Sequence, residues 1–599
     1  MHARPIRWTT TLLGLAFVLV LAAASDAAAQ RFPADSWMQY QNVEEAGFDA
    51  TKLDSARASW EALPSSAFLV VADGAVVAAW GDVGRRFMCH SVRKSFLSAL
   101  YGVYWDRGEL DLNKQMEDLG IDDHPLPLME TEREARILDL LKARSGVFHP
   151  AAYAGRTDSR PRGSEGPGRY FAYNNWDFNT LAYVLEQETG AEVFTAFDEH
   201  FAGPLGMEDW RVSDGYYHYE RDKSRYPAYP FRMSSRDAAR FGLFFAREGV
   251  WDGTRILSRN WVRRSTATYS IDDEVRGYGF MWWTYLEPRF LQHGMYSAIG
   301  VGNQMIAVLP DLDMVIVNRA DTYEGEGTPL AGLLDLIEEV LEARTGDPVA
   351  DPALAPLTVE ADPMITMASG DRLAGFQGEF PYPPAPLGLP VRATLEIEPG
   401  DGHLVSRSPT AGTFRLYLQD DGTLVAEDSR ERYWPVDDDG AFAGLAAADH
   451  LVSAAVLTAA DGRTGRARAL LNRVEAAAGP LPEVGTAVVD LLAGETRAAE
   501  RAVRALGETH DPGTVAGSVF RAGLQLAELE RYGASARVLE LATRLRPDAA
   551  LFWATLAEVL AAADRDRDAA RAAERALEID PENETARETL DRLREVERR

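Results

Sequence analysis

The chain of 599 residues is longer than one hydrophobic core supports, so we expect three units of about 100–200 residues each. A content of 46% hydrophobic and 10% aromatic residues argues against wholesale disorder and against a protein with many membrane spans. The formal net charge of −30 would repel nucleic acid and anionic membrane surfaces, so no nucleic-acid partner is expected.

Residues 1–29 have the pattern of an export signal. Arg4 and Arg7 precede an apolar run from Leu12 to Ala23, and three alanines at 27–29 suit a cleavage site. The run is shorter than the roughly 17 residues that a spanning helix needs, which favours a cleaved signal over an uncleaved N-terminal anchor. Both interpretations predict that the body of the protein is exported, to the periplasm or the extracellular space.

Residues 30–345 show the elements of an antiparallel sheet packed by helices, with fold class α/β (α+β). In chain order the patterns are a β-hairpin around Asp73-Gly74 (68–80), a buried helix (91–108), two helices in a long polar stretch (179–189 and 235–249), a second hairpin (304–318) and an amphipathic helix (330–344). The polar stretch is expected to form a helical subdomain that borders a substrate site.

Two smaller units are predicted after this domain. Residues 346–365 contain several Pro and Gly residues and are predicted to form a linker. Over 366–475 short β-prone runs alternate with Gly and Asp turns, as in a small all-β domain. Residues 480–599 are rich in Ala, Leu, Arg and Glu and repeat with a period of 34, for example from Pro547 to Pro581. This part resembles the tetratricopeptide repeat, and the alternative is a plain helical bundle. Such repeats predict a groove for a protein partner or a dimer contact.

Ser91 and Lys94 form the first chemical motif. They are three residues apart at the start of a predicted helix, so both side chains face the same way and the amine can take the serine proton. The helix N-terminus favours an anion beside the serine. The S-x-x-K pattern is short and common by itself, so other features of the sequence must decide whether it marks a catalytic pair.

Lysine usage supplies the first context. Of 62 basic residues only five are lysine, at positions 52, 94, 114, 142 and 223, and the other 57 are arginine. An arginine cannot be deprotonated, whereas a buried lysine can become neutral. Because Arg93 precedes Lys94 directly, a proton-accepting role explains the lysine better than a surface charge does.

Tyr173-x-Asn175 supplies the second context. The phenol could carry a proton between the nucleophile and the leaving group, and the amide could hold the lysine or a substrate carbonyl. The same three residues, Tyr-Asn-Asn, are also typical of a turn.

These motifs, with FRMSSRDAARFG at 231–242 and GYGFMWW at 277–283, together resemble the β-lactamase-related serine hydrolases. That family includes class C β-lactamases, penicillin-binding D-alanyl-D-alanine carboxypeptidases, esterases and nylon-oligomer amidases, and the last two look most similar. The resemblance covers about residues 45–345 and implies a sheet with a helical subdomain and the site between them. It implies that Ser91 is the acyl-accepting nucleophile, that Lys94 and Tyr173 are base and proton shuttle, and that Asn175 is a polar support.

The third motif of the family departs from its usual Lys-Thr-Gly or His-Thr-Gly. Ala298-Ile299-Gly300 falls at that position, and no lysine is present to bind a substrate carboxylate. In this register the backbone N–H of Val301 would join that of Ser91 as the second oxyanion donor. Because the lysine that would bind a substrate carboxylate is missing, activity on penicillins or acidic peptides is not favoured. The alternative is that the glycines only permit a tight strand entry.

Substrate contacts are predicted at Trp176, His293, Gly300 and Gly302, and further apolar contacts at Tyr278, Trp282 and Trp283. Trp, Tyr and His at such positions are also common in cores. Cys89 is the only cysteine, which excludes an intrachain disulfide, and is expected to be a small buried residue near the site.

Rival catalytic motifs are missing from the sequence. It holds no G-x-S-x-G, H-E-x-x-H, P-loop or G-x-G-x-x-G pattern, so no metal and no cofactor are expected. His90 adjoins Ser91, but neighbouring residues on a helix do not face each other. The sequence predicts an exported hydrolase of an ester or amide in a small molecule or peptide. The alternatives are a non-catalytic scaffold that binds peptidoglycan or peptides, and a D-Ala-D-Ala carboxypeptidase or β-lactamase.

Overall fold

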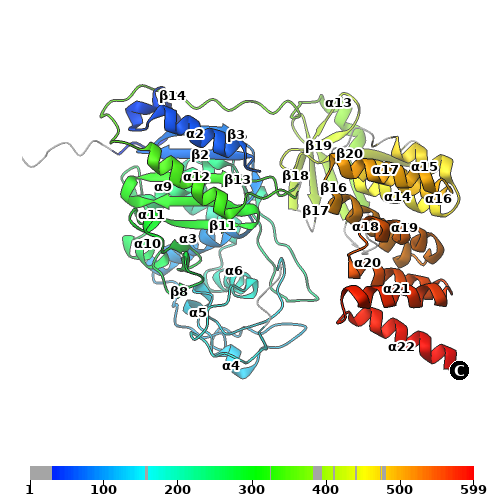
Figure 1. Cartoon of the computed structure of the whole chain (residues 1–599). Helices are drawn as coiled ribbons and strands as arrows, with labels where there is room; N and C mark the ends of the chain where they lie inside the picture. Colours follow the sequence, from blue (N-terminus) through cyan, green and yellow to red (C-terminus); the bar gives the residue numbers. More distant parts are fainter. Residues whose placement is uncertain are drawn as a thin grey trace, which may run out of the picture. The chain divides into compact units, whose positions relative to one another are not determined.

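The computed structural model describes residues 30–154, 160–323, 325–381, 394–408, 412–438, 441–472, 474 and 481–598. The predicted export signal lies outside these residues. The described part of the chain divides into two compact units, one that extends to residue 361 and one that begins at residue 362. In Figure 1 the first unit carries the blue to green part of the chain and the second the yellow to red helices. None of the described helices is long and apolar enough to cross a bilayer.

The first unit is built on a ten-stranded sheet in the order β14-β1-β3-β2-β13-β12-β11-β10-β9-β8, antiparallel except where β1 meets β3. Its strands are β1 (Met38–Tyr40), β2 (Ala67–Ala72), β3 (Ala75–Gly81), β8 (Ser270–Ile271), β9 (Arg276–Tyr278), β10 (Trp283–Tyr285), β11 (Tyr296–Gly300), β12 (Gln304–Leu309), β13 (Met314–Arg319) and β14 (Leu354–Pro356). Two short pairs lie outside it: β4 (Phe87–Met88) with β5 (Arg232–Met233), and β6 (Val250–Trp251) with β7 (Thr254–Arg255).

Helices cover both faces of the sheet. Successive side chains along each strand point to opposite faces, and the side chains on each face are buried in a separate core. Phe68 and Val70 of β2 belong to the core that α2 (Ala50–Glu61) and α12 (Leu330–Ala343) close. Leu69 and Val71 belong to the larger core on the other face.

That larger core contains α3 (Arg93–Asp106), α6 (Asn175–Thr189) and α9 (Ser235–Ala246). The remaining helices of this unit are short: α4 (Glu130–Arg133), α5 (Ile137–Leu141), α7 (Val193–Phe197), α8 (Gly203–Leu205), α10 (Arg259–Ser265), α11 (Pro288–Leu291), the 3-10 turns η1 (Val43–Ala46), η2 (His90–Val92), η4 (Val212–Asp214), η5 (Val301–Asn303) and η6 (Pro310–Leu312), and the π turn η3 (Asp198–Ala202). The sheet with helices on both faces confirms the predicted fold class.

Local sequence explains the elements that position the site. The hairpin of β2 and β3 turns at Asp73 and Gly74, both with positive φ, as a two-residue hairpin turn requires. Helix α6 begins where the side chain of Asn174 accepts the backbone N–H of Trp176 at 3.0 Å, and it ends at Gly190 in the left-handed conformation.

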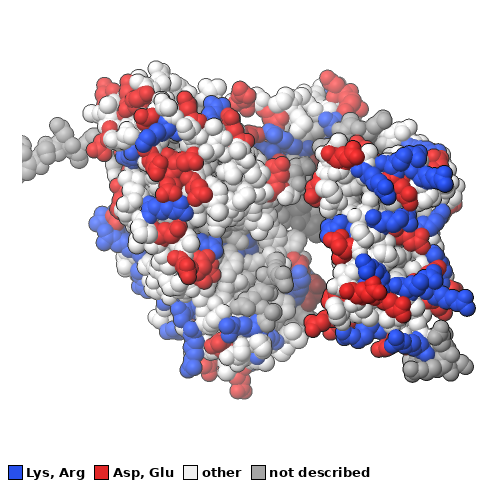
Figure 2. Space-filling model, in the orientation of Figure 1, with Lys and Arg blue, Asp and Glu red and all other residues white. Residues whose placement is uncertain are grey.

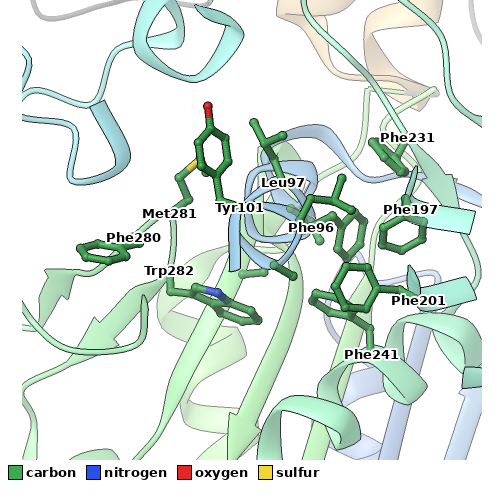
Figure 3. Close-up of a cluster of buried hydrophobic side chains, with 14 of the residues drawn as sticks. Phe96, Leu97, Tyr101, Phe197, Phe201, Phe231, Phe241, Phe280, Met281 and Trp282 are labelled. Carbon is green, nitrogen blue, oxygen red and sulfur yellow. The ribbon is translucent and has the colours of Figure 1, made fainter. Parts of the chain in front are cut away.

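Helix α3 is fixed in the core by aromatic packing. Phe96 points among Phe197, Phe231 and Phe241 (Figure 3), with ring centroids 5.0, 5.4 and 4.8 Å away. One residue earlier, Ser95 Oγ donates to the carbonyl of Met281 at 2.7 Å. The helix that follows Ser91 is therefore held rigidly.

The second unit begins with α13 (Gly370–Leu373), η7 (Ala374–Phe376) and a seven-stranded antiparallel meander: β15 (Gly378–Pro381), β16 (Thr394–Pro399), β17 (Leu404–Ser408), β18 (Gly412–Leu418), β19 (Leu424–Ala426), β20 (Arg432–Asp438) and β21 (Ala441–Ala447). Its helices are α14 (Ala448–Ala460), α15 (Thr464–Leu471), α16 (Leu481–Leu492), α17 (Thr496–Thr509), α18 (Pro512–Glu528), α19 (Tyr532–Leu545), α20 (Ala550–Ala562), α21 (Asp566–Ile579) and α22 (Glu584–Arg598). The strands therefore end near residue 447, not 475, because the Ala-, Leu- and Val-rich run from 448 forms α14, which shares a core with the later helices.

The helices of this unit repeat in pairs. Helix α19 begins at Tyr532 and α21 at Asp566, 34 residues later, which matches the predicted period. Gly523 of α18 permits the close approach within one pair, since a Cβ there would lie 2.6 Å from the side chain of Leu539. On the face that Figure 2 shows, acidic and basic side chains are interspersed over this unit.

Candidate active site

Ser91 and Lys94 are brought together as predicted. Ser91 lies in the 3-10 turn η2, α3 begins two residues later, and Lys94 Nζ donates to Ser91 Oγ at 2.8 Å. Ser91 is partly exposed, whereas Lys94 is 1% exposed. The serine hydroxyl is thus accessible and its lysine partner is shielded from water.

The surroundings of Lys94 favour a neutral amine. Its Nζ lies 4.2 Å from the ring centre of Tyr173 and 4.5 Å from that of Phe178, and it has no ion pair in the described part of the chain. Burial holds the pKa of Lys94 well below its usual range, and the charge of Arg93 lowers it further. A neutral amine at this distance can accept the proton of Ser91.

Tyr173 is the second partner of Lys94. Lys94 Nζ donates to its hydroxyl at 2.5 Å, and its ring stacks on Trp283 at 5.5 Å and meets Tyr278 edge-on at 5.8 Å. Burial raises the pKa of Tyr173 to about 12, against the opposing effects of a hydrogen bond with Ser91 and the charge of Arg93. The phenol therefore keeps its proton at neutral pH and can relay it.

Arg93, the first residue of α3, is a buried cation next to Lys94. Its side chain is fully buried between the rings of Tyr153 and Tyr229, at 5.4 and 4.9 Å, and it has no carboxylate partner among the residues described. Its NH1 donates to the carbonyl of His90 at 3.2 Å and its NH2 to Asn179 Oδ1 at 3.4 Å.

Replacement of Arg93 by methionine is expected to move the acidic limb of the pH–rate profile to higher pH. The charge of Arg93 lowers the pKa of Lys94, so its removal raises that pKa and more of the amine is protonated at any given pH. Acylation then falls at neutral pH and recovers in alkaline buffer. Acylation rates measured over a pH series check this, with the exposed Arg57→Met as control. If the acidic limb of the pH–rate profile does not move in Arg93→Met, the assignment of that limb to Lys94 is contradicted.

The end of β11 lies against the nucleophile. A Cβ at Gly300 would lie 2.3 Å from the carbonyl oxygen of Cys89 and 3.0 Å from the backbone nitrogen of Ser91. Glycine is needed here for this close approach, since its φ of −127° is open to any residue. Gly300, for which a substrate contact is predicted, thus lies beside Ser91. Val301 follows it and is 63% exposed, and Gly302 turns the chain at a φ of 76°.

Asn175 supports the site from the other side. Its Nδ2 donates to the carbonyl of Tyr153 at 2.6 Å, and its buried Oδ1 has no hydrogen-bond partner among the residues that the structure describes. The amide therefore fixes Tyr153 and does not contact Lys94. Of the two roles expected for the amide, holding the lysine or holding a substrate carbonyl, the first is not seen here because the Tyr153 carbonyl takes the Nδ2 donor, and the second stays a prediction.

Two predicted substrate contacts lie elsewhere. Trp176 is fully buried and donates its Nε1 to Asp123 Oδ2 at 2.7 Å, so it is a core residue. His293 lies before the start of β11 at Tyr296, whereas Gly300, which lies beside Ser91, ends that strand, and the strand spans about 13 Å at 3.3 Å per residue. The burial of Trp176 and the place of His293 before β11 do not favour a substrate contact at either residue, and both contacts stay predictions. Tyr278 and Trp282 are likewise buried, whereas Trp283 is partly exposed beside Tyr173.

Cys89 is the buried residue that the sequence predicts. It is fully buried, and burial raises the pKa of its thiol to about 11, so the sulfur stays protonated and unreactive. The described residues contain no group of three His, Cys, Asp or Glu side chains placed to hold a metal ion.

The contacts of His90 and Arg93, which lie close to Ser91 in the chain, were not predicted from the sequence. His90 does not contact the Ser91 hydroxyl, as expected, but its ring nitrogens lie 2.8 Å from Thr322 Oγ1 and 2.8 Å from the hydroxyl of Tyr153. His90 directly precedes the S-x-x-K motif and Arg93 lies within it, and these positions were the available signal. Their partners come from segments that no motif connects.

Comparisons with known proteins place the candidate site within one family match. The family model described as Beta-lactamase matches residues 54–325, the range that holds Ser91, Lys94, Tyr173 and Gly300. Similar solved structures include a penicillin-binding protein from Bacillus halodurans (16% identity, 48% of this chain and 99% of that chain, TM-score 0.36). Others are an octameric penicillin-binding protein homologue from Pyrococcus abyssi (16%, 65% and 97%, 0.38) and a mutant class C β-lactamase (13%, 51% and 99%, 0.39). At these TM-scores the three structures carry no further argument.

Proposed function

We propose that the protein cleaves an ester or amide through an acyl-enzyme on Ser91, a proposal supported by the match of residues 54–325 to the Beta-lactamase family model. One observation carries the proposal. Lys94 is 1% exposed, lacks an ion pair in the described part of the chain, and lies 2.8 Å from Ser91 Oγ and 2.5 Å from the Tyr173 hydroxyl. A buried amine between two hydroxyls is suited to moving protons and has little use as a structural charge.

The proposed reaction has two steps. As Ser91 Oγ bonds to the substrate carbonyl carbon, its proton passes to Lys94 Nζ, and the carbonyl oxygen becomes an anion held by the backbone N–H groups of Ser91 and Val301. The bond to the leaving group then breaks; that group takes a proton from Tyr173, which regains one from Lys94. In the second step water gives its proton to the same pair, its oxygen attacks the acyl carbon, and Ser91 Oγ leaves with a proton.

The substrate is proposed to be uncharged near the acyl group. The third-motif position holds Ala298-Ile299-Gly300, without the lysine that would bind a carboxylate. The stacked rings of Tyr173 and Trp283 and the exposed side chain of Val301 offer apolar contacts instead. We therefore favour esters and neutral amides over penicillins and D-alanyl peptides.

A hydrolysis screen tests this proposal. Purified protein is incubated with p-nitrophenyl esters of increasing acyl length, p-nitroanilides, nitrocefin and a D-alanyl-D-alanine peptide, with Ser91→Ala as control. We expect turnover of esters or anilides that Ser91→Ala lacks. Preference for nitrocefin or the D-alanyl peptide would show that the substrates are β-lactams or D-alanyl peptides instead of esters and neutral amides. Activity that survives in Ser91→Ala would contradict the assignment of Ser91 as nucleophile.

Export is part of the proposal. It depends on the pattern of residues 1–29, and the helical repeats would then offer a surface to a protein partner outside the cytoplasm. Sequencing of the mature N-terminus tests export: cleavage near Ala29 is expected, and an intact Met1 on protein retained in the cytoplasm would contradict it.

A further inference from the structure

His90 has an unfavourable backbone conformation next to the nucleophile. Its φ is +48°, in the left-handed region that non-glycine residues seldom adopt, and it opens the turn η2 that presents Ser91. Such conformations persist only where surrounding contacts hold them, and they are found preferentially at active sites. What holds His90 is therefore of functional interest.

Both ring nitrogens of His90 have hydroxyl partners. Nε2 lies 2.8 Å from Thr322 Oγ1, and Nδ1 lies 2.8 Å from the Tyr153 hydroxyl. A neutral imidazole has one N–H and one acceptor, and each hydroxyl can take either role, so one ring can satisfy both contacts. Burial first, and then the charge of Arg93, lower the pKa of His90 to about 4, so the ring is neutral at neutral pH.

The two partners lead to opposite sides of the site. Thr322 follows β13, and a Cβ at Gly302 would lie 2.5 Å from its Cγ2, so its methyl group packs against the turn that contains Val301. Tyr153 belongs to the long segment before α6, and its carbonyl accepts Nδ2 of Asn175 at 2.6 Å. Its backbone N–H donates to Glu220 Oε1 at 2.7 Å, which fixes it further.

We propose that His90 is a positioning residue, which ties the Ser91 turn to the Val301 turn through Thr322 and to the start of α6 through Tyr153. It sets the distance between the nucleophile, the proposed oxyanion donor and Tyr173, and it takes no proton from Ser91. This inference rests on the proposed acyl-enzyme at Ser91. A displacement of about 1 Å between such groups costs on the order of 10²-fold in rate.

The test measures acylation of the folded enzyme by the p-nitrophenyl ester burst, per Ser91 site titrated. His90→Gly keeps the positive φ without strain and removes both hydrogen bonds, so we expect acylation to slow about 10- to 100-fold with little change in KM. His90→Asn tolerates the same φ and offers an amide near the Nδ1 position, so it should recover part of the rate.

Single isosteric changes keep the test independent of folding. Tyr153→Phe and Thr322→Val each remove one hydroxyl and should each slow acylation, and His90→Gly/Tyr153→Phe should be no slower than His90→Gly alone. The matched control is Tyr104→Phe, which removes the hydroxyl 3.3 Å from Nε2 of His200, a histidine–tyrosine pair outside the site. We expect no change there.

Two results overturn the inference: wild-type acylation in His90→Gly, or losses that multiply in the double variant. A wild-type protein that shows no burst with any ester of the screen and no adduct on Ser91 contradicts the proposed function instead, and the inference with it.

Discussion

Replacement of Lys94 by arginine is expected to slow acylation of Ser91 about 10²–10⁴-fold, the usual contribution of a positioned general base. Arginine stays protonated even where a buried lysine is neutral, so it cannot accept a proton from the serine. The site needs a neutral amine, since Lys94 is 1% exposed and burial holds its pKa well below the usual range. Burst kinetics with an activated ester measure the effect.

The control for this variant is Lys52→Arg, whose exposed side chain donates to the carbonyl of Glu342 at 3.1 Å and lies outside the site. It should acylate like the wild type. If Lys94→Arg also acylates at the wild-type rate over the full pH range, Lys94 is not the base.

Replacement of Gly300 by alanine is expected to lower activity about 10²–10³-fold, as the loss of one oxyanion donor does. The added Cβ would lie 2.3 Å from the backbone oxygen of Cys89, and a backbone atom cannot move aside as a flexible side chain can. The end of β11 must shift away from Ser91, and Val301 shifts with it. Overpacking of this kind also costs about 1–3 kcal/mol of stability.

Steady-state kinetics and thermal unfolding measure both effects of Gly300→Ala. Gly346→Ala is the matched control, because a Cβ at Gly346 meets nothing within 4 Å. It should leave the rate unchanged. Full activity in Gly300→Ala would show that the end of β11 does not shape the site.

The sequence predicts the chemical centre well because its residues are close in the chain or carry a distinctive pattern. Ser91 and Lys94 share one helix start, and the rarity of lysine singles out Lys94. The Tyr173 hydroxyl lies 2.5 Å from Lys94 Nζ, although 79 residues separate the two, and here the resemblance to a family supplied the link.

Contacts formed by tertiary packing are not predicted. Trp176 follows the motif Tyr173-x-Asn175 directly, but the helical turn aims it at Asp123 in the core. Thr322 and Tyr153 reach His90 from segments 232 and 63 residues away in sequence, and nothing in their local patterns marks them.

In the fold, too, features marked by local sequence patterns are predicted, and those that depend on tertiary packing are not. Hairpins with clear turn residues, such as Asp73-Gly74, and helices with strong periodicity lie where the patterns place them. The boundary near residue 447 differs because a run of small apolar residues is compatible with a strand or a helix, and only its packing against α16 makes it helical.

Covalent labelling tests the central claim most directly. The protein is incubated with a fluorophosphonate and digested, and the modified peptide is sequenced by mass spectrometry. We predict one phosphonyl adduct, on Ser91, formed much more slowly in Lys94→Arg and absent in Ser91→Ala. A folded protein that forms no adduct on Ser91, or that forms it equally fast without Lys94, would contradict the account.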